Sequence, residues 1–340
     1  MRRRLVPVAC HSGGLAARLV AAGVAAPLLG GRLACTLAEI VDWSPGTARR
    51  SAWVDALAVE WPEPFVTPRS APFDRPRLMG ILNITPDSFS DGGSFADTGG
   101  ALAHGLRLAA DGADIVDVGG ESTRPGAVEV PLDEELRRVL PVVAALAEHG
   151  VAVSIDTRKA AVMEAALAAG ATIINDVSGL THDPRSLEVA AGSRAFVVLM
   201  HMAGEPATMN DAPRYEQCAL EVLDWLAARV AACEAAGIAR ERIVVDPGLC
   251  FAKHEPHNLD LLHQLALLHG LGCPVMLGAS RKGWTAAIDR EWPAGERLAA
   301  SLAAAQWGLE RGVQLYRVHD VPAHRQLLAA WRALSGMETP

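Results

Sequence analysis

Aromatic residues are scarce in this chain of 340 residues, where Phe, Trp and Tyr together make up 5%. Charged residues are also few, at 21%, whereas half of all residues are hydrophobic. The apolar content is therefore mainly Ala, Val, Leu and Ile, which is enough for a sizeable core and excludes a disordered or collagen-like chain. The length suits either about two average domains or one large α/β barrel.

Positive charge is in deficit, because 31 Lys and Arg residues stand against 39 Asp and Glu residues, for a formal net charge of −8. Such a chain has no overall attraction for nucleic acid or for an anionic membrane, and we expect neither as a partner. An anionic ligand would have to be held by a few local cationic groups.

Paired cysteine motifs and long apolar runs are also missing. The six cysteines form no C-x-x-C pair, which favours reduced thiols over a disulfide framework and predicts a cytoplasmic protein. Arg18 and Arg32 interrupt the N-terminal apolar stretches before either could span a membrane. His11 and the pair Gly13-Gly14 break the run that a secretory signal would need.

Two regions differ in composition. Residues 1–75 combine Gly and Ala tracts with a segment rich in Trp and Pro that begins near Trp61, and we predict an accessory N-terminal extension of unknown role with a stiff linker. Residues 76–336 alternate short β-branched runs with longer Ala- and Leu-rich stretches of helical period. That alternation is typical of repeated βα units around a parallel sheet.

The second region contains eight candidate strands, at 77–83, 114–118, 151–155, 172–176, 195–200, 242–246, 274–278 and 313–318. Helices are expected between them, including 97–111, 132–148, 158–168, 214–236 and 295–310. Eight βα units favour a closed TIM (β/α)8 barrel over an open doubly wound sheet.

Polar residues follow nearly every candidate strand, at the end where such barrels carry their reactive groups. Any one of them alone also suits a capping or loop role, but together they indicate a site. Four of them, Asp156, Asn175, Asp246 and Lys282, match the donor and acceptor edge of a flat heterocycle. Four others, Asn83, Arg124, Arg317 and His319, suit a diphosphate, with the Asn83 amide oxygen available to a divalent ion such as Mg²⁺.

Two segments carry a resemblance to a known family. Residues 78–93, LMGILNITPDSFSDGG, and residues 117–126, DVGGESTRPG, resemble the two signatures of dihydropteroate synthase. The similarity continues in order through the ends of the later candidate strands, across roughly residues 77–322. Residues 1–75 contain no motif of that family.

The resemblance implies a reaction in which 6-hydroxymethyl-7,8-dihydropterin diphosphate and 4-aminobenzoate give 7,8-dihydropteroate and diphosphate, with Mg²⁺ as cofactor, in folate synthesis. It assigns pterin binding to Asp156, Asn175, Met202, Asp246, Phe251 and Lys282. It assigns 4-aminobenzoate binding to Thr123, Arg124, Pro125, Ser280 and Lys282. The diphosphate falls to Asn83, Arg124, Arg317 and His319, with Asn83 as metal ligand, and catalysis to these four with Asp156 and Lys282.

The resemblance also implies a homodimer, for which apolar positions of the last two helices, such as Leu298 and Leu327, are available. The same positions equally suit helices that simply cover the barrel. This chain departs from the family pattern after Gly248, where Leu249-Cys250-Phe251-Ala252-Lys253 places side chains at positions that are commonly glycine. Ala279 stands where a larger apolar residue is common.

Two alternatives remain open from the sequence. A methyltetrahydrofolate:corrinoid methyltransferase uses a similar barrel and pterin set, but it needs no diphosphate site, so Arg124 and Arg317 argue against it. A catalytically weak pterin-binding paralogue is the other alternative, suggested by residues 1–75 and by the departure at residues 249–252.

Overall fold

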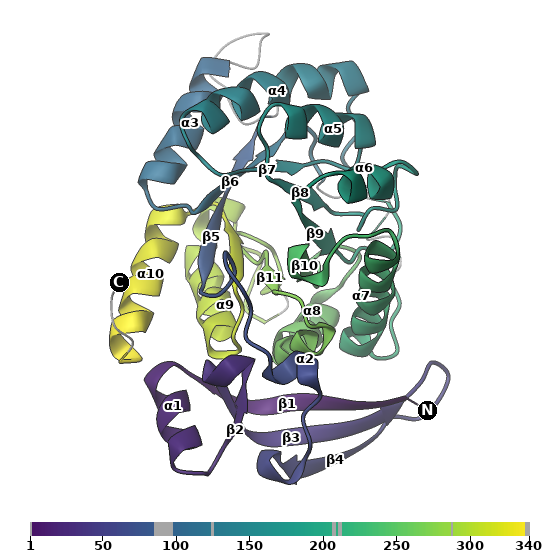
Figure 1. The fold of residues 1–340 in the computed structure, drawn as a ribbon, viewed down its shortest axis with the longest axis vertical. Coiled ribbons are helices and arrows are strands. Elements are labelled where there is room, and N and C mark those ends of the chain that lie inside the picture. The colour runs from purple at the N-terminus through teal and green to yellow at the C-terminus, as the bar shows by residue number, and fades with distance from the viewer. Residues whose placement is uncertain are drawn as a thin grey trace.

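The computed structural model describes residues 2–84, 98–123, 126–205, 209, 213–286 and 288–336. Within them lie two sheets, one of four antiparallel strands near the N-terminus and one of eight parallel strands (Figure 1). In this described part, no helix is both long enough and apolar enough to cross a membrane.

The eight-stranded sheet is the predicted barrel, with strands in the order β10-β9-β8-β7-β6-β5-β12-β11. Its two end strands, β10 and β11, meet through one bridge between Val245 and Val275, so the sheet nearly closes. The strands are β5 (Arg77–Asn83), β6 (Ile115–Gly119), β7 (Val153–Asp156), β8 (Ile173–Asp176), β9 (Phe196–Met200), β10 (Ile243–Asp246), β11 (Met276–Leu277) and β12 (Leu315–Val318). All eight fall within or one residue beyond the ranges predicted from the sequence, and the (β/α)8 prediction is confirmed.

Helices cover the outside of the barrel (Figure 1). They are α3 (Thr98–Ala110), α4 (Leu132–Glu148), α5 (Ala160–Ala168), α6 (Ser186–Gly192), α7 (Cys218–Ala235), α8 (Glu255–His263), α9 (Leu298–Glu310) and α10 (Val321–Leu334). The bounds of α4 match the prediction, and those of α3, α5, α7 and α9 differ from it by at most four residues. The predicted ranges did not include α6, which has only seven residues, or α8, which begins with the mostly polar residues Glu-Pro-His-Asn and so shows no clear apolar period.

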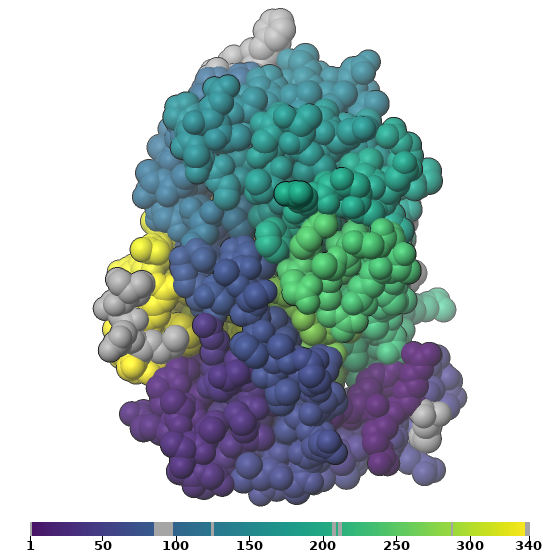
Figure 2. Space-filling model, in the orientation of Figure 1, coloured from purple at the N-terminus to yellow at the C-terminus, as the bar shows by residue number. Residues whose placement is uncertain are grey.

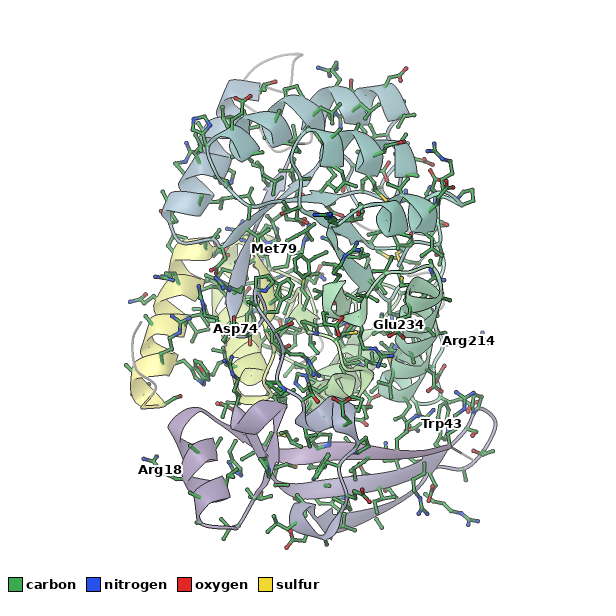
Figure 3. The ribbon with its side chains drawn as sticks, viewed as in Figure 1. Arg18, Trp43, Asp74, Met79, Arg214 and Glu234 are labelled. Atoms are coloured by element: carbon green, nitrogen blue, oxygen red, sulfur yellow. The ribbon has the colours of Figure 1, made fainter. Side chains whose placement is uncertain are left out.

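Phe73 closes the barrel at the amino ends of its strands. Its side chain is buried, meets the Phe196 ring edge to face at 5.3 Å, and packs in one apolar cluster with Met79, Ile115 and Leu315 (Figure 3 labels Met79). These residues lie at or near the beginnings of their strands. Because the amino end is filled with apolar side chains, the polar groups of the barrel interior lie toward the carboxyl ends.

The N-terminal extension is a folded unit rather than a loose segment. β3 (Leu33–Trp43) pairs along its length with β1 (Arg2–Ser12) on one side, and with β2 (Ala26–Leu28) and β4 (Arg50–Asp55) on the other. Helix α1 (Gly13–Ala21) connects β1 to β2. The extension lies against one side of the barrel, at the bottom of Figure 2, where β1 contacts α9 and residues 265–271.

Apolar and ionic contacts fasten the extension to the barrel. Val6 and Trp43 pack with Leu220 of α7 and Leu267, and Arg4 forms an ion pair with Asp224, with Nη2 and Oδ1 2.7 Å apart (Figure 3 labels Trp43). The Pro-rich segment expected as a stiff linker is also attached. It contains the short helix α2 (Glu63–Val66) and the buried Arg69, whose guanidinium donates to carbonyl oxygens that include Cys273 O and His269 O of the barrel.

Candidate active site

Arg317 is the centre of a buried ionic group at the carboxyl ends of the strands. From β12 its Nε donates to Asp117 Oδ2 and its Nη2 donates to Asp156 Oδ2, each over 2.7 Å. Asn175 at the end of β8 donates from Nδ2 to the same Asp117 oxygen, over 3.0 Å. Both carboxylates raise the pKa of Arg317 against the lowering effect of burial, so this guanidinium stays charged.

This arrangement modifies the expected division into a heterocycle set and a diphosphate set. Arg317 was predicted to bind the diphosphate, but two of its nitrogens, Nε and Nη2, already donate to carboxylates. Nη1 forms no hydrogen bond with any residue that the structure describes. Arg317 therefore belongs to both sets, since it orients Asp156 and still has a nitrogen to offer to an anion.

Asp117 is a site residue that the sequence reasoning missed. It lies in the middle of β6, its side chain is fully buried, and its Oδ1 has no hydrogen-bond partner in the described part of the chain. A buried carboxylate oxygen without a partner is costly, which makes this oxygen a candidate contact for ligand or water. The available signal was an acidic residue inside the otherwise apolar run DIVDV.

The environment of Asp156 favours its protonated form. Burial raises the pKa of Asp156 to about 7, because the pull of Arg317 in the other direction is opposed by Asp117 and Asp176. The group can therefore change its charge near neutral pH, when a cationic or anionic ligand arrives.

Asp246 and Lys282 form the second part of the site. Asp246 Oδ1 accepts from Gly248 N over 2.7 Å, and burial raises the pKa of this carboxyl against the opposing effect of Lys282. Lys282 donates to Leu249 O over 2.8 Å, and its Nζ lies 4.6 Å from the centre of the Phe251 ring. A methyl group added at Gly278 would lie 3.6 Å from Asp246 Oδ2 and 3.9 Å from Arg317 Cβ, so both parts share one space.

The apolar walls expected from Met202 and Phe251 lie together. Met202 belongs to a cluster with Val177, Met200 and Ala252, and Phe251 packs against that cluster. A flat ring placed beside Asp246 would therefore have a sulfur- and aromatic-lined surface next to its hydrogen-bonding edge.

The last two loops of the barrel meet through Ser280 and His319. Ser280 Oγ accepts from His319 N over 3.1 Å and is also 3.1 Å from His319 Nδ1. Ser280 is buried, and His319 directly follows β12. The predicted aminobenzoate residue and the predicted diphosphate residue are thus in contact.

Asn83 ends β5 and faces Asp156. A methyl group added at Gly119 would lie 3.6 Å both from Asn83 Oδ1 and from Asp156 Oδ2. The Asn83 side chain forms no hydrogen bond within the described residues, so its amide oxygen is available to a ligand. No group of three or more His, Cys, Asp or Glu side chains among those residues could hold a metal ion by itself.

The departure after Gly248 has a clear backbone consequence. Cys250 and Ala252 adopt φ values of 63° and 52°, the left-handed region that glycine enters without strain. A non-glycine residue there costs about 1–2 kcal/mol. Gly248 itself, at φ 68°, admits no side chain, because a Cβ would lie 2.0 Å from His201 O.

Lys253 is a second residue that the sequence reasoning did not place in the site. Its buried ammonium donates to His201 O and Phe251 O and lies 2.9 Å from His201 Nδ1. Burial lowers the pKa of Lys253 to about 7 and also lowers the pKa of His201 well below its usual value. Lys253 therefore braces the loop that carries Phe251 against the end of β9.

The structure thus brings Asn83, Asp156, Asn175, Met202, Asp246, Phe251, Ser280, Lys282, Arg317 and His319 to one end of the barrel. Thr123 follows β6 on the same rim and is partly exposed. Arg124, predicted for both aminobenzoate and diphosphate, and Pro125, predicted for aminobenzoate, lie outside the described residues. The described residues therefore lie together as expected for one site with groups for the polar edge of a heterocycle and for an anion.

Comparison with known proteins identifies the class. Residues 79–319 match the family model of pterin binding enzymes, and the chain belongs to that family.

Within this class the similar proteins are dihydropteroate synthases. The chain is 46% identical over 264 residues to that of Neisseria meningitidis serogroup C, which covers 77% of this chain and 93% of the relative. It is 45% identical over 258 residues to that of Escherichia coli K12, in an alignment that covers 76% of this chain and 91% of the relative. Both alignments cover nearly the full length of the relatives.

Solved structures agree. The Xanthomonas albilineans dihydropteroate synthase with 4-aminobenzoic acid superposes with a TM-score of 0.73 at 47% identity, covering 78% of this chain and 95% of that one. The structure of the same enzyme in complex with 7,8-dihydropteroate superposes with a TM-score of 0.71 at 44% identity. The superposition covers 78% of this chain and 96% of that one.

Proposed function

We propose that this chain acts as a dihydropteroate synthase: it joins 4-aminobenzoate to 6-hydroxymethyl-7,8-dihydropterin diphosphate and releases diphosphate. The observation that carries this function is the shared space of Asp156, Asp246, Lys282 and Arg317 at the carboxyl ends of four strands. It is supported by relatives of that name that match the barrel at 45% identity or more.

The pterin is held by its hydrogen-bonding edge. Asp246 and Asn175 accept from and donate to the ring, while Lys282 offers an ammonium beside the Phe251 face. These groups are fixed before substrate arrives, because the Asp246 carboxylate is bonded to Gly248 N and the Lys282 ammonium to Leu249 O. Preorganised groups need no rearrangement during the reaction.

The chemical step breaks the bond between the pterin methylene carbon and the diphosphate oxygen. The bonding electrons leave with diphosphate, the cation that develops spreads into the ring, and the aminobenzoate nitrogen forms the new bond and loses a proton. Arg317 Nη1, His319 and Arg124 stabilise the leaving anion, while Asp156 and Asp117 hold the Arg317 guanidinium in place.

Mg²⁺ is the proposed cofactor, held by Asn83 Oδ1 together with substrate and water oxygens. Oxygen ligands and few protein contacts are typical of Mg²⁺ bound with phosphates, where the ion neutralises phosphoryl charge. We expect chelation with EDTA to lower the rate of dihydropteroate formation by about 10²-fold or more, with recovery on excess Mg²⁺. An unchanged rate in metal-free buffer would contradict this role.

The function is tested with purified protein, 6-hydroxymethyl-7,8-dihydropterin diphosphate and Mg²⁺, with and without 4-aminobenzoate. We expect diphosphate and dihydropteroate to form together and only when aminobenzoate is present. Pterin binding without either product would instead support the weak paralogue. Methyl transfer from methyltetrahydrofolate to a corrinoid protein would support the methyltransferase.

A homodimer through the outer faces of α9 and α10 is the proposed assembly. Leu298 and Leu334 are exposed there, at 37% and 89%, whereas Leu328 and Trp331 of α10 are buried against this chain's own barrel. Sedimentation velocity should give about twice the chain mass of 35.8 kDa. A single species of chain mass at micromolar concentration would refute the dimer.

The proposed location is the cytoplasm. All six cysteines are free thiols, and four of them are buried. Reduced cysteines suit a reducing compartment.

A further inference from the structure

Four buried charged side chains form a cluster beside the site, next to Thr157, which follows Asp156. Glu121 follows β6, Glu135 lies in α4, and Arg158 and Lys159 precede α5. All four are largely buried, with side-chain exposures of 5%, 1%, 6% and 12% in that order. The cluster reaches the surface through two further carboxylates, because Arg158 Nη1 donates to Glu205 Oε2 over 2.8 Å and Lys159 Nζ lies 3.8 Å from Glu129 Oε1.

Lys159 and Glu121 tie together the two ends of the segment that follows β6. Val130 N donates to Glu121 Oε2 over 2.9 Å, which brings residue 130 back to residue 121. Lys159 Nζ donates to the same Glu121 oxygen over 2.6 Å and to Val130 O over 2.8 Å. One ammonium therefore holds both ends of the segment that begins with Ser122 and Thr123.

The other side of the cluster fixes the segment to β7. Lys159 Nζ donates to Glu135 Oε2 over 2.7 Å, and Thr157 Oγ1 donates to Glu135 Oε1 over 2.6 Å. Arg158 Nη2 donates to Glu121 Oε1 over 2.7 Å. Thr157 directly follows Asp156. The cluster therefore sets the distance between the Asp156 carboxyl group and the segment that carries Thr123.

Burial and hydrogen bonding act in opposite directions on these groups, and the bonds prevail. Burial raises the pKa of Glu121, but the bonds from Lys159 and Arg158 outweigh it, so the pKa lies below its usual value. Burial lowers the pKa of Lys159, yet the bonds to Glu121 and Glu135 bring it above its usual value. Glu121 and Lys159 are therefore charged near neutral pH, and strong charge-assisted bonds fix the geometry of the cluster.

We propose that Lys159 is a positioning residue for 4-aminobenzoate: it holds Glu121 and Val130 at a set distance from Asp156, so that Thr123, two residues after Glu121, meets this second substrate. The inference rests on the proposed function and on two assignments that the family resemblance implies, Thr123 to aminobenzoate and Asp156 to the pterin. Lys159 touches neither substrate. Loss of the Lys159 ammonium therefore displaces the aminobenzoate site and leaves the pterin site intact.

The test compares Lys159→Met with the wild-type chain in steady-state kinetics for each substrate. We expect the KM for 4-aminobenzoate to rise about 10-fold or more, since small misplacements at a reacting centre have effects up to about 10²-fold. The KM for the pterin diphosphate should stay within about twofold, because Asp246, Asn175 and Lys282 keep their contacts. Equal rises in both KM values, or no rise in either, would overturn the proposal.

A structural readout accompanies the kinetics. Hydrogen exchange at Val130 N should become about 10-fold faster in Lys159→Met, while the amides of β7 keep their protection. Unchanged exchange at Val130 would also contradict the proposal. If the wild-type chain formed no dihydropteroate, the proposed function would fail, whereas the exchange measurement would still decide whether Lys159 anchors the segment.

Two further variants separate positioning from stability. Arg4→Met breaks the ion pair with Asp224, whose side chains are 8% and 27% exposed and lie between the extension and α7, so it should lower stability and leave both KM values unchanged. Glu121→Gln keeps the side-chain shape and one acceptor, and it replaces Lys159→Met if that variant does not fold. It should raise the aminobenzoate KM about threefold, a smaller effect in the same direction.

Discussion

Replacing Arg317 with Met should lower kcat/KM for dihydropteroate formation by about 10³-fold, the size of effect seen when a preorganised charge near a leaving group is lost. The change removes the donors to Asp117 and Asp156 together with Nη1, the nitrogen proposed to bind the diphosphate. It also leaves two buried carboxylates without their cation. Unfolding in urea should therefore show about 3–5 kcal/mol less stability, measured beside steady-state rates.

Arg240→Met is the matched control for this substitution. Arg240 also forms two hydrogen bonds to a carboxylate, that of Glu234, but both groups are partly exposed and lie away from the site. Losing an exposed pair should change stability by at most about 1 kcal/mol and leave the rate unaltered. An Arg317→Met enzyme within tenfold of wild-type activity would sink the assignment of Arg317 to catalysis.

Replacing Asp246 with Asn should weaken pterin binding by about 10²-fold. The carboxylate offers acceptors to ring N–H groups through charge-assisted hydrogen bonds, each worth about 1.5–3 kcal/mol, and the amide presents a donor in place of one of them. The fold should tolerate the change, since the Asn carbonyl oxygen can still accept from Gly248 N. Calorimetric titration with the pterin diphosphate measures the loss directly.

Asp224→Asn provides the comparison for Asp246→Asn. It makes the same chemical change at the carboxylate that anchors Arg4 of the extension, far from the pterin pocket. Pterin affinity should not change in this variant. If Asp246→Asn bound the pterin as tightly as the wild-type chain, Asp246 would not be the acceptor for the ring.

The alternation of short apolar runs with helical stretches was sufficient to predict the barrel. Strand and helix periods are local properties, and eight short apolar runs separated by helical stretches leave few other folds. The residue at each strand end is equally local, so Asn83, Asp156, Asn175 and Asp246 could be assigned to one rim before any contact was known.

The structure of the N-terminal region could not be predicted from local sequence patterns. β1 and β3 can be recognised as strands only from their pairing in the structure. Neither sequence shows the alternation of polar and apolar residues that would predict a strand. Phe73 and Arg69 likewise have no local signal for their roles, because one fills the barrel and the other binds carbonyl groups about 200 residues away.

The sequence by itself therefore determined the fold class, the rim that carries the polar groups and the family signatures, since all three depend on residue types at short spacing. Only the tertiary structure decided which of these groups act together. Arg317 and Asp117 are 200 residues apart in the chain, and their contact depends on β12 lying next to β5 and β5 next to β6. The Lys159 cluster depends in the same way on how β6, α4 and β7 pack, because side-chain contacts across a barrel follow from strand order and packing rather than from spacing along the chain.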